Sequence, residues 1–279
     1  MGTTETRAAE TRGKTMKLMN TNDEAITTIS ALLIGQSGCG KTTSLRTLPK
    51  TGTVIACSER SLLPLRGLGY DVLRLEEWAD LAALHEMFMH PEATPGYADA
   101  GPLVQACKVL VIDSLSDVSA MCAKHILTVD RKVITSERSG GKEDRPKGIY
   151  EEQMTLADYG LYGTRMLNLI SSFAHLPIHF IATCVEGQKD NADGSCRMKT
   201  VNLMGKQAAE NCPAYFDIVL NMAPLPTDDG KHKQMWKTFN DGICMGKDSS
   251  GKLDPYEPTN WTALFKKIRS TGAKTDATK

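Results

Sequence analysis

The segment GQSGCGKT, Gly35 to Thr42, restricts the possible folds of this chain more than any other feature. Its glycines, lysine and threonine have the spacing of the Walker A pattern, and they stand between an apolar run, ALLI, and a helical pattern, TSLRTL. Glycines let successive backbone N–H groups turn inward around phosphate oxygens, and the start of the next helix adds positive potential. We therefore predict a phosphate-binding loop formed by Gly35, Gln36, Ser37, Gly38, Cys39, Gly40, Lys41, Thr42 and Thr43.

The chemistry of this loop assigns roles to three side chains. Lys41 is expected to reach the β- and γ-phosphates of a nucleotide, and Thr42 to ligate Mg²⁺. A second metal-binding carboxylate is needed at the tip of a neighbouring buried strand, and VLVIDS supplies Asp113, with Ser114 beside it as a hydrogen-bonding partner. A guanine-reading NKxD segment is absent from the sequence, so ATP is the favoured nucleotide.

Alternating strand and helix patterns predict an α/β fold. Apolar runs at 25–35, 52–58, 71–76, 108–114, 177–184 and 216–222 predict strands, and the first, fourth and fifth are continuous enough to be central. Residues 78–90 and 156–173 have helical patterns. This alternation indicates a mostly parallel sheet flanked by helices, and KHKQMWKTF with DGICMGKDSSGKLDP indicates an antiparallel hairpin at one sheet edge.

Bulk composition limits the remaining possibilities. Lys+Arg and Asp+Glu both number 33, so a DNA-binding surface would have to be local. The 8 cysteines have no CxxC pair or zinc-ligand spacing, which indicates reduced thiols in a cytoplasmic protein. Neither a membrane-length apolar run nor a signal-peptide pattern is present, so we expect no membrane association. One domain over residues 21–270 is expected, with disordered tails at 1–20 and 271–279.

Hydrolysis also requires a group that orients or deprotonates the attacking water. Many P-loop ATPases place a Glu directly after the second metal ligand, but Ser114 occupies that position here. The strand pattern TVIACSER ends in Glu59 and is followed by LLPLRGLGYDVLRL, residues 62–75, which reads as helical although its end overlaps a strand run. The alternative is that Glu59 is a solvated strand-end charge paired with Arg60.

At Glu59 and Asp113-Ser114 the chain resembles the RecA-like P-loop ATPases. That resemblance implies that Glu59 is the catalytic carboxylate, and that Thr183 or Gln188, at the end of the next core strand, senses the γ-phosphate. An equal alternative is that Thr183 is a threonine at a strand end whose hydroxyl forms an ordinary structural hydrogen bond. Over residues 28–266 the element order, AENCPAYFDIVLNM and GKDSSGKL are similar to phage-associated AAA-type proteins, a group that includes the small RecA-like single-strand annealing recombinases.

The same resemblance concerns the C-terminal part of the chain. Related ring and filament ATPases use a late KxRxG-like segment to reach the nucleotide of the neighbouring subunit. Here GKDSSGKLD keeps Lys247 and Gly251 but has Ser249 in place of the arginine. Lys247 is therefore a candidate trans-acting catalytic residue, with Lys252 as its helper, and self-association into a ring or filament is implied.

Two segments stand where RecA-like proteins bind single-stranded DNA. Residues 131–147 have six basic and three acidic residues in a flexible, glycine-containing composition. Residues 186–206 have four basic and three acidic residues. The candidate DNA contacts are Arg131, Lys132, Arg138, Lys142, Arg145 and Lys147 in the first segment, and Lys189, Arg197 and Lys199 in the second.

The leading interpretation is a DNA-dependent ATPase of recombination or replication, encoded by a phage and acting in the cytoplasm of a bacterial host. Its cofactors would be ATP and Mg²⁺, and its partners single-stranded DNA, further copies of itself and a single-strand DNA-binding protein. A nucleotide or small-molecule kinase, with the arginine-rich segment as a lid, is an alternative. A slow ATPase for assembly or packaging is another. DNA stimulation of ATP turnover separates these interpretations.

Overall fold

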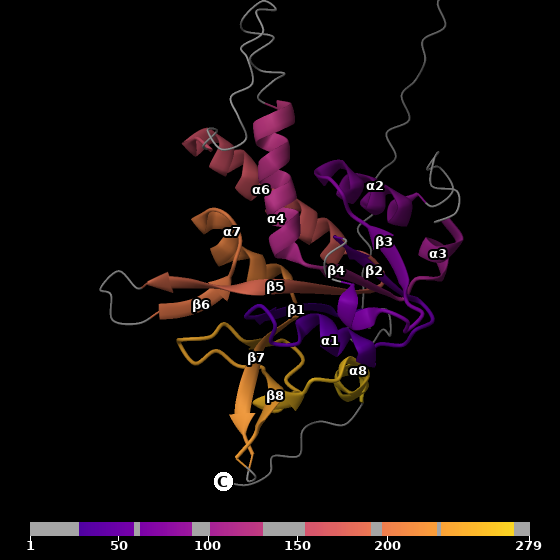
Figure 1. Ribbon diagram of the computed structural model, residues 1–279, viewed down its shortest axis with the longest axis vertical. Helices are drawn as coiled ribbons and strands as arrows, with labels where there is room; N and C mark the ends of the chain where they lie inside the picture. Colours follow the sequence, from indigo (N-terminus) through magenta and orange to yellow (C-terminus); the bar gives the residue numbers. More distant parts are fainter. Residues whose placement is uncertain are drawn as a thin grey trace, which may run out of the picture.

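One mixed sheet organises the fold (Figure 1). The computed structural model describes residues 28–58, 62–90, 101–130, 154–190, 197–227 and 230–270. Its strands are β1 (Ser30–Gly35), β2 (Thr53–Cys57), β3 (Asp71–Arg74), β4 (Val109–Asp113), β5 (His179–Asp190), β6 (Arg197–Val201), β7 (Ile218–Pro226), β8 (His232–Lys237), β9 (Lys247–Asp248) and β10 (Tyr256–Pro258).

The strand order is β10-β8-β7-β1-β5-β4-β2-β3, with β6 paired to β5 and β9 to β7. The strands from β7 to β3 in this order are parallel, whereas β8, β6 and β9 pair antiparallel with their neighbours. In this order β1, β5 and β4 are central strands. They are apolar on both faces because both faces of the sheet are covered there. The predictions of a parallel α/β sheet and of a C-terminal antiparallel hairpin are both confirmed.

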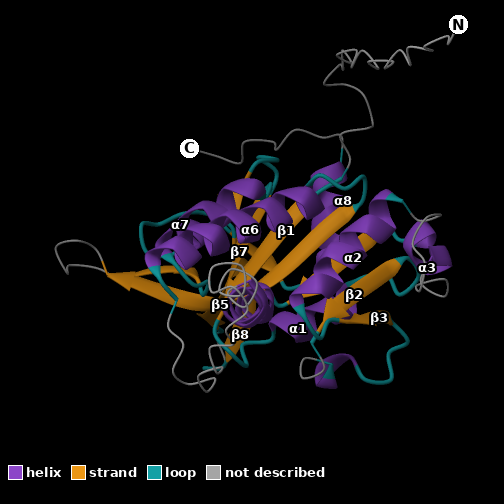
Figure 2. Ribbon diagram, turned by 90° about the horizontal axis from the view of Figure 1, so that it is seen from above, coloured by secondary structure: helices purple, strands orange, loops and turns teal. Residues whose placement is uncertain are grey.

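Helices cover both faces of the sheet (Figure 2). They are α1 (Lys41–Ser44), α2 (Trp78–Met89), α3 (Gly101–Ala106), α4 (Leu115–His125), α6 (Leu156–Ala174), α7 (Lys206–Asn211) and α8 (Trp261–Arg269). One buried cluster packs α2, α3, α4, α6 and α7 against the sheet, and a second packs α8 and the 3₁₀ turn after α1, Leu45–Thr47, against the opposite face. In Figure 1, α4, α6 and α7 lie above β5, and α1 and α8 lie below it.

Local sequence explains where the longer helices begin. Ser114 precedes α4, and its Oγ accepts a hydrogen bond from the Asp117 N–H. Thr155 and Asp158 form a reciprocal capping box at the start of α6. The predicted helices at 78–90 and 156–173 correspond to α2 and α6, and their bounds agree to within one residue.

The helical prediction for residues 62–75 is wrong. This segment forms one 3₁₀ turn, Leu63–Leu65, then a loop, and then the edge strand β3. Gly67 and Gly69 both have a φ of 76°, a left-handed conformation that stops a helix from continuing. The prediction of a strand beginning at Asp71 is therefore confirmed, and the apolar residues before it form a turn and a loop.

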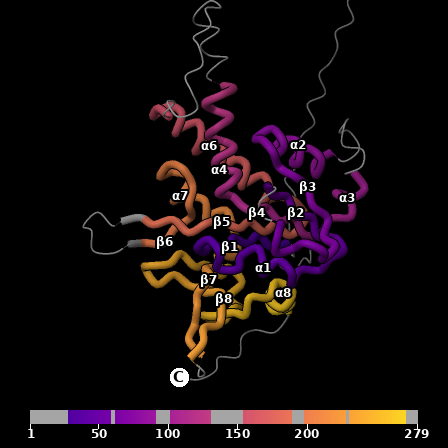
Figure 3. The backbone as a smooth tube through the Cα atoms, in the orientation of Figure 1, coloured from indigo at the N-terminus to yellow at the C-terminus, as the bar shows by residue number. Residues whose placement is uncertain are grey.

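Two antiparallel ribbons extend from the sheet (Figure 3). In one, β5 continues to Asp190 and pairs with β6, so most of the described residues of the second proposed DNA segment lie in strands and not in a loop. In the other, β7 and β8 remain paired as far as Pro226 and His232, beyond the last residue of β7 that pairs with β1. We name them the β5–β6 ribbon and the β7–β8 ribbon.

Candidate nucleotide-binding site

The predicted phosphate-binding loop connects β1 to α1 at the carboxyl end of the central strands. Gly35 is the last residue of β1, and a Cβ atom there would lie 2.6 Å from Cys39 Sγ and 2.8 Å from Met222 Cβ. Gly40 has a φ of 97° and immediately precedes α1. Both positions therefore require glycine, one for space and the other for its backbone conformation. The side chains of Gln36, Ser37 and Thr43 are exposed, so their contribution to phosphate binding would come from the backbone.

Lys41 is held across the opening of this loop. Its side chain is buried, and Nζ donates hydrogen bonds to the carbonyl oxygens of Gly35 at 2.8 Å and Gln36 at 2.9 Å. These two bonds place a positive charge next to the loop N–H groups. An ammonium held in this way is suited to neutralising phosphate oxygens.

Three side chains from three elements meet beside Lys41. Thr42, on α1, donates a hydrogen bond from Oγ1 to Asp113 Oδ2 at 2.8 Å. Thr183, on β5, donates from Oγ1 to Asp113 Oδ1, so both carboxylate oxygens accept a threonine hydroxyl. The sequence predicted each residue separately, and the structure brings all three together at the end of β4, within β5 and at the start of α1.

Burial dominates the electrostatics of Asp113. Its side chain is 3% exposed, and loss of hydration raises its pKa above the ordinary value. The hydrogen bonds from Thr183 and Thr42 and the charge of Lys41 oppose that rise. A bound divalent cation would favour the charged carboxylate, and Mg²⁺ typically uses one or two carboxylates together with waters and substrate phosphates. Thr42 and Asp113 therefore fit a Mg²⁺ bound together with a nucleotide.

Hydrogen bonds at the start of α4 connect the segment after Asp113 to β5. Ser114 donates a hydrogen bond from Oγ to Asp117 Oδ2 at 2.9 Å, so its hydroxyl is used in capping α4. Ser116 Oγ accepts from the Val185 N–H at 3.0 Å and lies 3.4 Å from Cys184 Sγ. Ser114 thus orients the chain after Asp113, as a supporting residue of the site.

Replacing Thr183 by valine keeps the shape of this side chain but removes the hydrogen-bond donor to Asp113. A hydrogen bond to a charged group contributes about 1.5–3 kcal/mol, so we expect kcat to fall by about tenfold or more. Thr183→Ser keeps the hydroxyl and is expected to stay within about threefold of wild type. The measurement is the ATPase rate as a function of Mg²⁺ concentration. Equal rates in the valine and serine variants would show that the hydroxyl has no such role.

Several predicted residues lie outside the described parts of the chain. Glu59 is one of them, although β2 ends two residues earlier and Cys57 is the register neighbour of Asp113. The first DNA segment, with Arg131, Lys132, Arg138, Lys142, Arg145 and Lys147, lies outside as well. Lys189 and Arg197 belong to the β5–β6 ribbon, but their side chains are not described. The roles given to these residues stay predictions.

The structure also shows a carboxylate that the sequence reasoning missed. Glu186 lies three residues beyond Thr183, and its side chain is 4% exposed and forms an ion pair with Lys199 at 3.2 Å. The sequence signal was an acidic residue directly after the apolar run FIATCV. Lys199 therefore neutralises a buried charge, which reduces its availability to a DNA phosphate. Gln188, the alternative sensor, is exposed on the same ribbon.

The ammonium groups of Lys247 and Lys252 donate hydrogen bonds to backbone carbonyl oxygens of their own chain. Lys247 Nζ, on β9, donates to the carbonyl oxygens of Phe216 at 2.7 Å and Ala214 at 3.4 Å. Lys252 Nζ donates to the carbonyl oxygen of Ile268 at 2.7 Å. A trans-acting role would require Lys247 to leave these partners, and that role stays a prediction.

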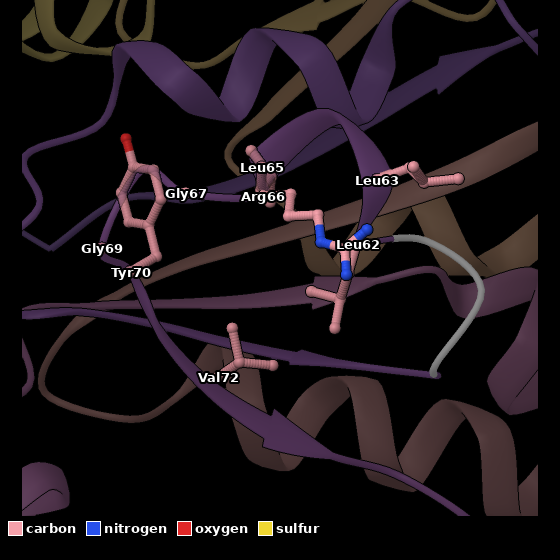
Figure 4. A pocket seen from close by; sticks show the side chains of 8 residues that line it. All are labelled: Leu62, Leu63, Leu65, Arg66, Gly67, Gly69, Tyr70 and Val72. Atoms are coloured by element: carbon pink, nitrogen blue, oxygen red, sulfur yellow. The ribbon is translucent and has the colours of Figure 1, made fainter.

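A separate hollow of about 430 Å³ lies at the β3 edge (Figure 4). Tyr70, at its rim, donates a hydrogen bond to the carbonyl oxygen of Leu48 at 2.9 Å. The hollow contains none of the predicted phosphate-site residues, so it is not part of the nucleotide site. It is lined by Leu62, Leu63, Leu65, Arg66, Gly67, Gly69, Tyr70 and Val72.

The fold and this site define a P-loop nucleotide-binding protein. A family model described as an AAA domain matches residues 27–250, which is most of the chain. The chain belongs to this AAA domain family and is a P-loop ATPase; the family implies use of a nucleotide, typically with Mg²⁺.

Nothing among curated proteins matches the chain. Within the described residues, none of the helices is both long and apolar enough to cross a membrane.

Proposed function

We propose that this ATPase acts on DNA, as a phage-encoded single-strand binding or annealing recombinase or a related replication–recombination ATPase. The observation that carries the proposal is the course of β5. This strand contains Thr183, which hydrogen-bonds to Asp113, and it continues without interruption to Asp190 in the β5–β6 ribbon. A change at the γ-phosphate would therefore be transmitted along one rigid strand to a projecting element that contains Lys189 and Arg197.

The chemistry proposed for the site is attack of a water molecule on the γ-phosphorus of ATP. The bond between that phosphorus and the bridging oxygen breaks, and ADP and phosphate leave. Glu59 would take the proton of the attacking water, because it follows the strand that ends beside Asp113. Lys41 would neutralise the developing phosphate charge. Thr42 and Asp113 would hold Mg²⁺, directly and through water.

DNA would bind to the basic segment 131–147 and to the β5–β6 ribbon. Copies of the chain would associate in a ring or filament, with Lys247 and Lys252 reaching the neighbouring nucleotide. A single-strand DNA-binding protein would present the strand to be annealed. Bound ATP would order the DNA-binding elements, and hydrolysis would release them.

The test is the steady-state ATPase rate with and without single-stranded DNA, in wild type and in Glu59→Gln. The proposal predicts a rate that DNA stimulates, and loss of that rate in the variant. Binding should weaken with salt, because phosphate contacts release counterions. A rate indifferent to DNA would favour the kinase or assembly interpretation, and phosphoryl transfer to an acceptor other than water would identify a kinase. An unchanged rate in Glu59→Gln would remove Glu59 from the mechanism.

A further inference from the structure

The side chain of Met222 lies against the phosphate-binding loop from outside the Walker A pattern. A Cβ atom at Gly35 would lie 2.8 Å from Met222 Cβ and 2.9 Å from its Cγ, and the Cβ position of Gly40 is 3.8 Å from its Cε. Met222 is 8% exposed, so it is almost fully buried in this contact. One side chain therefore fills the space next to both the residue that enters the loop and the residue that precedes Lys41.

The register of the sheet places Met222 at this position. The β1–β7 pairing ends at Ile34 and Asn221, so Met222 is the first residue of β7 beyond it and lies beside Gly35. Met222 also lies at the base of the β7–β8 ribbon, next to the first pair, Asn221–Lys237, and its partner on β8 is Trp236. The contact with the loop therefore depends on how this ribbon leaves the sheet.

The other side of the ribbon base contacts the helix that follows the loop. The Trp236 ring is fully buried, and its centroid lies 4.5 Å from that of Trp261. Trp261 Nε1 donates a hydrogen bond to Ser44 Oγ, in α1, at 3.2 Å. The base of the ribbon thus supports the loop through Met222 and α1 through the two tryptophans.

We propose that Met222 is a positioning residue that holds the phosphate-binding loop in the curvature needed for its N–H groups to converge on phosphate oxygens. A loop of glycines has high conformational freedom, and ordering it on binding reduces affinity. Packing of an unbranched thioether against Gly35 and Gly40 removes part of that freedom before the ligand arrives. The proposal requires phosphate binding at the loop, which is separate from any action on DNA.

The test compares Met222→Ala and Met222→Leu with a control, Met166→Ala, which removes a buried methionine from the core on the opposite face of the sheet. The dissociation constant is measured for a fluorescent ATP analogue and, by competition, for inorganic pyrophosphate. We expect Met222→Ala to raise both constants by about tenfold, with kcat at saturating ATP changed less than about threefold. Met222→Leu should restore both constants to within about twofold of wild type.

Pyrophosphate has no base or sugar, so an equal loss for both ligands assigns the effect to the loop. Met166→Ala should lower the unfolding temperature while leaving both dissociation constants unchanged. Unchanged constants in Met222→Ala, or an equal rise in the control, would overturn the proposal. If Met222→Ala does not fold, Met222→Val takes its place with the same criteria. The assays contain no DNA, so their outcome is independent of the DNA-dependent function proposed above.

Discussion

Lys41→Ala is expected to lower kcat/KM for ATP by about a thousandfold or more. Lys41 Nζ is held at the loop by hydrogen bonds to the carbonyl oxygens of Gly35 and Gln36. A positioned cation on a transferring phosphoryl group contributes about 3–5 orders of magnitude in related phosphoryl-transfer enzymes. Such a loss corresponds to about 4 kcal/mol or more of transition-state stabilisation.

The measurement for Lys41 is the steady-state release of phosphate, with Lys50→Ala as the matched control. Lys50 is exposed nine residues further along the chain, so its removal should leave the rate unchanged. The thermal unfolding temperature of each variant establishes that it is folded. A folded Lys41→Ala protein that hydrolyses ATP at more than a tenth of the wild-type rate would contradict the role assigned to Lys41.

Asp113→Asn is expected to have opposite effects on activity and on stability. Hydrolysis should fall by about a hundredfold or more, because the neutral amide binds Mg²⁺ poorly. The metal-free protein should become more stable. Burial raises the pKa of Asp113, so above that pKa the folded state carries an unfavourable buried charge. That penalty starts to decrease as the pH falls through the raised pKa and is absent below the ordinary pKa of an aspartate, whereas asparagine removes it at every pH.

Two measurements check this prediction: phosphate release with Mg²⁺, and the unfolding temperature in a chelator as a function of pH. Asp117→Asn is the control, because Asp117 is exposed and caps the same helix. Asp117→Asn should slightly destabilise α4 at neutral pH, whereas Asp113→Asn should stabilise the metal-free protein. If Asp113→Asn lowers the unfolding temperature as Asp117→Asn does, the buried charge is not the source of the effect.

Much of the fold was predictable because strong local signals agreed with the tertiary structure. The runs that end at Gly35, Asp113 and Cys184 are apolar on both faces, and only central strands of a covered sheet have that pattern. The Walker A spacing indicates the loop, and the acidic residue at the end of the apolar run VLVI indicates Asp113. Thr183 was predicted at a strand end, but β5 continues past it to Asp190; the structure places its hydroxyl within hydrogen-bonding distance of Asp113.

The parts that sequence reasoning missed depend on pairing between distant segments. The apolar pattern over residues 62–75 favours a helix, but Gly67 and Gly69 adopt a positive φ that ends any helix there. The extension of β5 depends on pairing with β6, which has no period-2 apolar pattern of its own. The contact of Met222 with Gly35 depends on the register of β7 with β1. No local pattern records such a register.

The central claim is that Thr42 and Asp113 hold the Mg²⁺ of a bound nucleotide, and the most direct test exchanges the metal. In Thr42→Cys a thiol replaces the hydroxyl, and soft sulfur binds Mg²⁺ poorly but accepts Mn²⁺ more readily. The measurement is the ratio of ATPase rates with Mn²⁺ and with Mg²⁺, compared with wild type and with Thr43→Cys, whose side chain is exposed. The account predicts loss of the Mg²⁺-supported rate in Thr42→Cys, substantial recovery with Mn²⁺, and a wild-type ratio in Thr43→Cys. A ratio unchanged in Thr42→Cys, or shifted equally in both variants, would contradict it.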